Sequence, residues 1–391
     1  MKYFSAQYIF TGKGLPLKQA LICTEDDGTI ISVTDTVGRL KERHSVEFYN
    51  GIIVPGFINC HCHLELSYLK DEIQPGIGLG RFLRAVTTTR DTIVKDRSKA
   101  IENADYRMSD EGVVVCADIC NSALTFDIKR KSKIKYINLL EVYGIDSVRA
   151  QARMDEIAEI ARSADKVNVP WFIVPHSAYS VSLPLFKKIK DITGSNKLTS
   201  LHFMESEDEI TFLENHSGPL MDAYQKLLSP SSRLDIVKNH VSAVYDEITR
   251  SGNLILVHNT VIKKKHIDEL RRRENLYYCL CPNSNKFIEN KIPPAGLLFN
   301  EHCNIVIGTD SLSSNRELSV VDELKTLQEY YPWIDLNSLL VCATLNGAKA
   351  VQEDDWAGSI EPGKRPGLVL IKDLDLLNMR LLPSTVAHRI I

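Results

Sequence analysis

The stretch GFINCHCHLELS, residues 56–67, places four side chains that bind metals well at the end of a short apolar run. Side chains along a β-strand point alternately to its two faces, so His61 and His63 should share one face and Cys60 and Cys62 the other. A mixed site of two cysteines and two histidines from this stretch is therefore sterically poor. We expect the histidines to be a ligand pair and the cysteines to be small buried apolar residues.

Seven more apolar runs follow along the chain, and amphipathic stretches such as residues 153–165 lie between them. Buried-type strands that alternate with helices predict parallel strands joined by crossovers. Eight such units in about 300 residues fit an α/β fold with a closed (β/α)8 barrel, the TIM barrel, and an open doubly wound sheet is the alternative. The seven runs are VVVCADI (113–119), KYINLLEV (135–142), WFIVPHS (171–177), LTSLHF (198–203), LILVHN (254–259), LYYCLCP (276–282) and NIVIGTD (304–310).

Both ends of the chain differ from this central pattern. Residues 1–54 contain short β-rich runs broken by Gly, Asp and Asn, and the same texture returns after Trp356. Such runs with frequent turn residues are typical of short antiparallel strands. We therefore expect residues 1–54 and 357–391 to pair into one small domain beside a barrel of residues 55–356.

Histidines gather where the predicted strands end. In a (β/α)8 barrel, the carboxyl ends of the strands form the active-site face. Three histidines and one carboxylate, with water completing the sphere, suit a catalytic site for a borderline divalent ion such as zinc. The alternative is a set of hydrogen-bonded histidines in a polar barrel mouth. Five of the eleven histidines and one aspartate fall at this edge: His61, His63, His176, His202, His258 and Asp310.

The stretch SLHFMESEDE, residues 200–209, adds a candidate base. A metal-activated water needs a nearby group that takes its proton and delivers it to the leaving group, and Glu205 follows His202 by three residues. Four-coordination leaves no place for His258, so we expect it to polarise the water or the substrate from outside the ligand set. Glu207 and Glu209 are expected to be helix-start charges on a solvated face.

Several of these motifs, in this order, resemble the amidohydrolase superfamily in its branch of metal-dependent deaminases and chlorohydrolases. The resemblance runs from about residue 50 to residue 371 and implies a small β-sandwich made from both chain ends. It also implies Glu205, His258 and Asp310 as catalytic residues and His176 as a substrate contact. Glu65 either reaches the substrate or merely lies on the loop. The implied metal ligands are His61, His63, His202 and Asp310, and the motifs are VPGFINCHCHLELS, VPHSAYSVS, LHFMESEDE, LVHNT, CPNSN and IGTDSLSSN.

The resemblance further implies hydrolysis of a non-peptide C–N bond, with deamination of an amino-substituted heterocycle as the leading prediction. The fourth- and eighth-strand motifs are most similar to those of members that act on adenosine derivatives, such as adenosylhomocysteine or aminofutalosine. Two-metal branches carry a carboxylated lysine where His176 stands here, so we expect one divalent ion, Zn²⁺ with Fe²⁺ as the alternative. The alternatives are a chlorohydrolase or cyclic amidine or amide hydrolase with the same site, and a non-catalytic scaffold.

The composition of the whole chain indicates which partners and which location to expect. The net charge is −3 and no run of 18 apolar residues occurs, so we expect neither nucleic acid nor a membrane as a partner. The start of the sequence has no secretory pattern and the nine cysteines are odd in number, which predicts reduced thiols and a cytoplasmic location. A small-molecule substrate is expected, and a homodimer is left open. We expect the segment with Arg81, Arg84 and Arg90 to form a lid that sets selectivity.

Overall fold

Two four-stranded parallel sheets form the central part of the chain in the computed structural model, which describes residues 1–41, 45–90, 92–93, 95–226, 228–248 and 250–391. In each sheet the strands lie in the order in which they occur along the chain. Each of the eight predicted runs overlaps one of these strands. The first sheet consists of β6 (Phe57–Cys62), β7 (Val113–Cys120), β8 (Lys135–Val142) and β9 (Trp171–Pro175). The second consists of β10 (Leu198–Phe203), β11 (Asn253–His258), β12 (Leu276–Leu280) and β13 (Ile305–Ile307).

The two sheets meet at two seams, and both seams carry predicted site residues. At one seam the backbone N–H of His202 donates to the carbonyl of His176 at 2.8 Å. At the other, the N–H groups of Thr309 and Asp310 donate to the carbonyl of His61 at 2.9 and 3.0 Å. The carboxyl ends of strands from both sheets are therefore held side by side.

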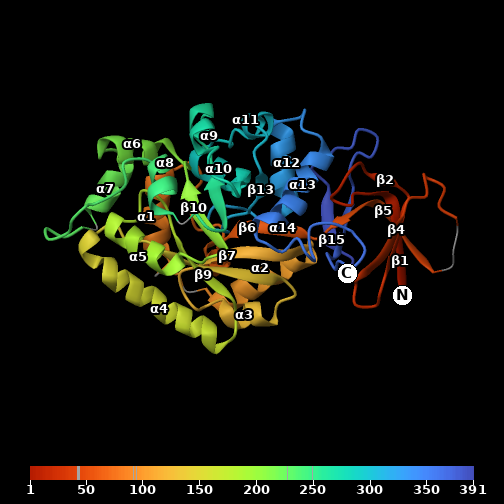
Figure 1. Cartoon of the computed structure of the whole chain (residues 1–391), viewed down its shortest axis with the longest axis horizontal. Helices are drawn as coiled ribbons and strands as arrows, with labels where there is room; N and C mark the ends of the chain where they lie inside the picture. Colours follow the sequence, from red (N-terminus) through yellow and green to blue (C-terminus); the bar gives the residue numbers. More distant parts are fainter. Residues whose placement is uncertain (42–44, 91, 94, 227, 249) are drawn as a thin grey trace.

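Helices lie between successive strands and cover the two sheets on the outside, as Figure 1 shows for α4 and α5 on one side and α9, α11 and α12 on the other. In α4 the apolar residues Met154, Ile157, Ala161 and Ala164 recur every three or four positions and are buried. The helices are α1 (Leu79–Thr89), α2 (Arg97–Asp110), α3 (Phe126–Lys131), α4 (Ala150–Lys166), α5 (Leu183–Thr193), α6 (Glu207–Asn215), α7 (Pro219–Gln225), α8 (His240–Ser242), α9 (Lys264–Leu270), α10 (Pro282–Glu289), α11 (Ala295–Asn300), α12 (Val320–Tyr330), α13 (Leu336–Ala343) and α14 (Leu345–Ala350). Shorter turns are η1 (Leu64–Leu69), η2 (Ser147–Arg149) and η3 (Ala243–Glu247).

Strands from both ends of the chain share a third sheet, with the order β15-β14-β5-β1-β3-β4 and β2 paired to β1. Strand β14, from the C-terminal part of the chain, pairs antiparallel with β5, from the N-terminal part. Figure 1 shows these red and blue segments together at one end of the molecule. The expected pairing of the two chain ends is therefore present. The strands are β1 (Lys2–Ile9), β2 (Leu17–Lys18), β3 (Leu21–Thr24), β4 (Ile30–Thr34), β5 (Val46–Pro55), β14 (Leu368–Lys372) and β15 (Val386–Arg389).

The parallel strands are buried on both faces, as parallel sheets require. Every residue of β7, β10 and β11 is buried. A large apolar cluster joins the strands to the surrounding helices, while a smaller one contains Cys60, Cys279, Cys281 and Ala348. Across the described part of the chain, no helix is long and apolar enough to cross a lipid bilayer. The cytoplasmic location and the homodimer stay predictions.

Candidate metal and catalytic site

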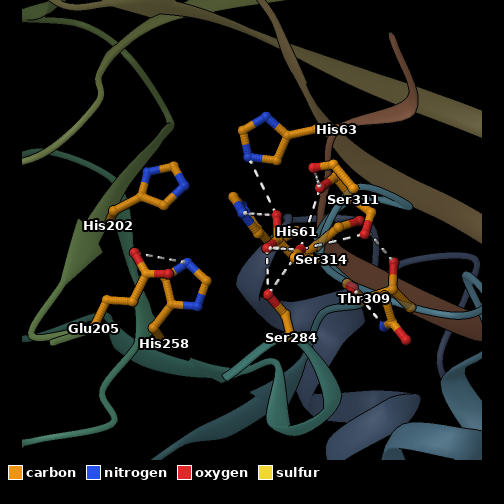
Figure 2. Close-up of polar contacts among 12 residues, drawn as sticks. His61, His63, His202, Glu205, His258, Ser284, Thr309, Ser311 and Ser314 are labelled. Carbon is orange, nitrogen blue, oxygen red and sulfur yellow. Dashed lines mark hydrogen bonds and ion pairs between the residues drawn. The ribbon is translucent and has the colours of Figure 1, made fainter. Parts of the chain in front are cut away.

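Four histidine rings converge at the strand ends, as Figure 2 shows. The ring centroid of His61 lies 4.9 Å from that of His63, 4.8 Å from that of His202 and 5.7 Å from that of His258. The carboxylate oxygen Oδ1 of Asp310 lies 3.6 Å from Nε2 of His61 and 3.5 Å from Nε2 of His63. The structure thus brings together the residues that the sequence predicts as metal ligands.

His61 shows why this cluster fits a metal ion. Its side chain is fully buried, and among the described residues neither of its ring nitrogens has a hydrogen-bond partner. A buried imidazole without partners costs free energy unless another group satisfies it. A divalent ion held between the converging nitrogens would satisfy one of the two ring nitrogens.

Hydrogen bonds orient two of the other candidate ligands. Nδ1 of His202 lies 3.0 Å from the carbonyl oxygen of His176, so Nδ1 carries the proton and Nε2 keeps a free lone pair. Oδ2 of Asp310 accepts hydrogen bonds from the hydroxyls of Ser284 at 2.5 Å and Ser314 at 2.7 Å. Its other oxygen, Oδ1, remains directed at the histidines.

The protonation states also suit metal binding. Burial lowers the pKa of His63 and that of His202, with smaller contributions from neighbouring histidines, so the neutral ligand form is favoured. Burial alone would raise the pKa of Asp310, but His61, His63 and His258 outweigh this effect and hold it well below its usual range. Three imidazoles and one carboxylate form a donor set that suits Zn²⁺.

Glu205 lies at the edge of this cluster. Its side chain is buried, and its Oε2 lies 3.7 Å from Nε2 of His258. Burial raises the pKa of Glu205 well above its ordinary value, and the nearby carboxylates of Glu209 and Asp310 raise it further. A carboxylic acid with a raised pKa can both take and deliver a proton near neutral pH.

His258 is held in one tautomer by its neighbour. The side-chain Nδ2 of Asn285 lies 3.1 Å from Nδ1 of His258, and an amide nitrogen can only donate, so the ring proton belongs on Nε2. Burial lowers the pKa of His258 to about 3, which keeps the ring neutral. Although a ring nitrogen of His258 lies within 4.8 Å of nitrogens of His61 and His202, an Nε2–H group favours hydrogen bonding over coordination. Its predicted place outside the ligand set stays a prediction that this geometry supports.

His176 has a partner that the sequence reasoning missed. Its Nδ1 lies 2.7 Å from Oε1 of Glu141, which is the penultimate residue of β8. Burial would raise the pKa of Glu141, but the charge and hydrogen bond of His176, together with His63 and Asn121, outweigh it and lower the pKa to about 2. Glu141 lies one residue before the end of the third predicted strand, so applying the strand-end reasoning to that strand would have found it.

Glu65 lies in the wall of the cavity, in the turn η1 that follows the histidine pair. It is buried and accepts hydrogen bonds from the hydroxyl of Ser122 at 2.6 Å and the backbone N–H of Asn121 at 3.2 Å. Burial raises its pKa to about 7. Of the two readings of Glu65, this position favours contact with a substrate.

The cavity above the cluster has a volume of about 380 Å³. One part of its wall is polar and includes Glu65 and His176, whereas α1 and α7 supply apolar side chains such as Phe82 and Leu220. Arg84 and Arg90 of the predicted lid line the cavity, and Arg81 is not among the lining residues within the described part of the chain. The role of this segment in selectivity stays a prediction.

The expectation for Glu209 was wrong. Its side chain is fully buried, and only Glu207 has the exposed position that was expected for both. The reason is local: Ser206 caps α6, and the carboxylate of Glu209 turns back to the backbone N–H of Ser206 at 3.2 Å. The spacing Ser-x-x-Glu at residues 206–209 is a capping-box signal, which could have revealed this.

The cysteines are buried as expected, but the alternation argument holds only in part. A register shift between Asn59 and Cys62 interrupts the pairing of β6 with β7, and Cys60 and Cys62 lie in different apolar clusters. Cys62 also lies near Cys116 and Asp118 in an arrangement that could hold a metal. However, the carboxylate of Asp118 is already paired with the ammonium of Lys129, 2.5 Å from its Oδ2.

Serine at Cys60 or at Cys62 should therefore leave the metal content unchanged. Elemental analysis of the two purified variants should match the unmodified chain, because neither thiol faces the histidine cluster. Each variant should lose roughly 1–3 kcal/mol of unfolding free energy, since a hydroxyl replaces a thiol in an apolar environment. A folded Cys62→Ser variant without metal would point instead to the site with Cys116.

Comparisons with known proteins agree with this geometry. A model of the amidohydrolase family matches residues 52–387. An adenosine deaminase of Helicobacter pylori is 27% identical over 334 residues, which cover 82% of this chain and 79% of the relative. An aminodeoxyfutalosine deaminase of Nitratiruptor sp. is 26% identical and covers 87% and 85%. The crystal structure of Helicobacter pylori aminofutalosine deaminase in complex with methylthio-coformycin has a TM-score of 0.78 at 24% identity, covering 96% of this chain and 93% of that one.

Proposed function

We propose that this chain, which belongs to the amidohydrolase family, is a hydrolytic deaminase of amino-substituted heterocycles, with an adenosine derivative as its substrate. In this reaction water adds to the carbon that carries the amino group, and ammonia leaves. The observation that carries the proposal is the place of Glu205, a buried acid with a raised pKa, 3.7 Å from His258 and beside the cluster of candidate metal ligands. The names of the relatives, which include two deaminases of adenosine compounds, support it.

We infer that the eight parallel strands close into one (β/α)8 barrel, with residues 55–356 as its domain. The two seams between the sheets support closure, as does the shared apolar cluster, to which all eight strands from β6 to β13 contribute residues. Residues 1–54 and 357–391 would then form the small β-sandwich domain, which the shared terminal sheet supports.

One divalent ion, Zn²⁺ with Fe²⁺ as the alternative, would be held by His61, His63, His202 and Asp310. Such an ion lowers the pKa of water to near neutrality and thereby supplies hydroxide to the substrate. The proposal of a single ion is supported by His176, which occupies the end of the fourth strand and is hydrogen-bonded to Glu141.

The protein groups around the cluster divide the remaining work. Glu205 would take one proton from water and deliver it to the ring nitrogen, and the second proton, from the added hydroxyl, would pass to the amino group, which leaves as ammonia. The Nε2–H group of His258 would stabilise negative charge that develops on the added oxygen, and Asp310 would assist the proton transfers. His176 and Glu65 would contact the substrate from the polar wall, and the apolar wall of α1 and α7 would receive a less polar substituent.

A substrate screen tests this proposal. The metal-loaded chain should release ammonia from at least one member of a panel of adenosine, 5′-deoxyadenosine, methylthioadenosine, adenosylhomocysteine and aminofutalosine, with guanine and cytosine as comparison compounds. Chloride release from a chlorinated triazine without any ammonia release would favour the chlorohydrolase alternative. Absence of both activities in a chain that binds its metal would favour the scaffold, which the complete set of donors and Glu205 argues against.

A further inference from the structure

We propose that Glu209 and His240 form a buried carboxylate–imidazole pair that holds Glu205 in its working position. The proposal rests on the deaminase function proposed above. Oε1 of Glu209 accepts hydrogen bonds from the backbone N–H groups of Glu205 at 2.8 Å and of Ser206 at 3.2 Å. Its other oxygen, Oε2, lies 2.7 Å from Nε2 of His240. Neither side chain touches the substrate cavity, so both would act through Glu205.

Glu205 needs such support because its own carboxylate has little to hold it. Among the described residues its nearest polar contact is Nε2 of His258, at 3.7 Å, which is too long for a hydrogen bond. The chain leaves β10 through Met204, whose φ of 51° lies in the left-handed region. The direction of the Glu205 side chain is therefore set by the backbone, and Glu209 binds that backbone at Glu205 and at the following residue.

His240 distinguishes this arrangement from an ordinary helix cap. A capping box requires only the cap residue and the acid three positions later, here Ser206 and Glu209. The second oxygen of Glu209 is instead bound by His240, which lies 31 residues away in sequence at the start of α8. The ring of His240 packs edge-on against Phe203, the last residue of β10, at a centroid distance of 5.5 Å. The pair thus ties together the strand end, α6 and α8.

The pair also affects the acid–base properties of the site. Burial is the largest cause of the raised pKa of Glu205, and the Glu209 carboxylate is the second. A group that must deliver a proton to a weakly basic ring nitrogen benefits from this increase. The hydrogen bonds of Glu209 and its charge therefore both favour a role for Glu209 in supporting Glu205.

Replacement of Glu209 tests the proposal. With the best substrate from the screen, Glu209→Ala should lower kcat by ~10-fold to ~10²-fold with little change in KM, because a displaced catalytic group loses turnover more than binding. Glu209→Gln keeps an oxygen that can accept from both N–H groups, and it should restore most of the turnover. Glu207→Ala changes an exposed acid of the same helix turn and should behave like the unmodified chain.

Metal content and the free energy of unfolding, measured on the same samples, separate positioning from folding. A folded, metal-loaded Glu209→Ala with unchanged kcat would overturn the proposal, as would a Gln variant as impaired as the Ala variant. If Glu209→Ala does not fold, two variants of His240 test the proposal in its place. His240→Leu should lower kcat several-fold, whereas His240→Gln, which retains an N–H donor, should have a kcat close to that of the unmodified chain. Equal kcat in these two variants would overturn it. If the unmodified chain deaminates none of the compounds, the proposed function fails before any variant is compared.

Discussion

Alanine at His61 should leave the purified chain without its metal ion and lower turnover by more than ~10⁴-fold. His61 lies inside the cluster: the centroid of its ring is within 6 Å of those of three other histidines, and its nitrogens have no hydrogen-bond partner among the described residues. The large expected loss of turnover follows from the pKa of the attacking water. A bound divalent ion lowers the pKa of water from roughly 15.7 to roughly 7, so its loss removes nearly all hydroxide at neutral pH.

Elemental analysis and steady-state kinetics on the same sample check this prediction. The unmodified chain should carry about one equivalent of a divalent ion, Zn²⁺ first among the candidates. Cys60→Ser is the matched control, because it changes the neighbouring buried residue and should keep both metal and turnover. A His61→Ala variant that retains one equivalent of metal would mean that His61 is not a ligand. Two equivalents in the unmodified chain would contradict the single-ion site.

The sequence predicted the strands and their chemistry for one physical reason. Parallel strands that are buried on both faces are continuous apolar runs, so each run and its end can be recognised without an alignment. Polar residues at those ends must then meet at one edge of the sheet, which explains why His202 and Asp310 could be placed together although 108 positions separate them. Each of the eight runs overlaps a strand, and the five predicted histidines do lie around one cavity or its floor.

Other features depended on local geometry that a simple alternating pattern does not contain. The register shift after Asn59 moves Cys60 and Cys62 into different clusters, although strict alternation would keep them on one face. Glu209 follows a helix cap and folds back, so counting it as a solvated helix charge was wrong. Glu141 was overlooked, although it is the penultimate residue of a strand.

The remaining features arise from tertiary contacts between distant segments. Ser284 and Ser314 both donate to Asp310, but nothing in the spacing of these three residues along the sequence shows that they meet. The apolar wall of the cavity comes from α1 and α7, whose placement over the strand ends is set by how the connecting segments pack. Such contacts depend on the whole fold.

Glutamine at Glu205 should keep the metal, the substrate affinity and the stability of the chain, while turnover falls by at least ~10². Glutamine has nearly the same size and shape as glutamic acid but carries no transferable proton. The pKa of Glu205 is raised in the folded chain. The folded chain therefore loses stability relative to the unfolded chain as the pH rises from the ordinary pKa of a glutamate to the raised pKa in the folded state. A neutral amide removes that cost, so the free energy of unfolding near neutral pH should not decrease.

The size of the effect follows from the protons that the reaction must move. The ring nitrogen has to gain a proton as hydroxide adds to the neighbouring carbon, and the amino group is a poor leaving group until it is protonated as well. A metal ion can supply hydroxide but cannot carry these protons, and the neutral Nε2–H group of His258 is held by Asn285 in one tautomer. Kinetics, elemental analysis and a urea titration on Glu205→Gln, with Glu207→Gln as the exposed control, check all parts of the prediction. Near-full activity of Glu205→Gln would assign the proton transfers to another residue, and loss of metal from that variant would make Glu205 a ligand.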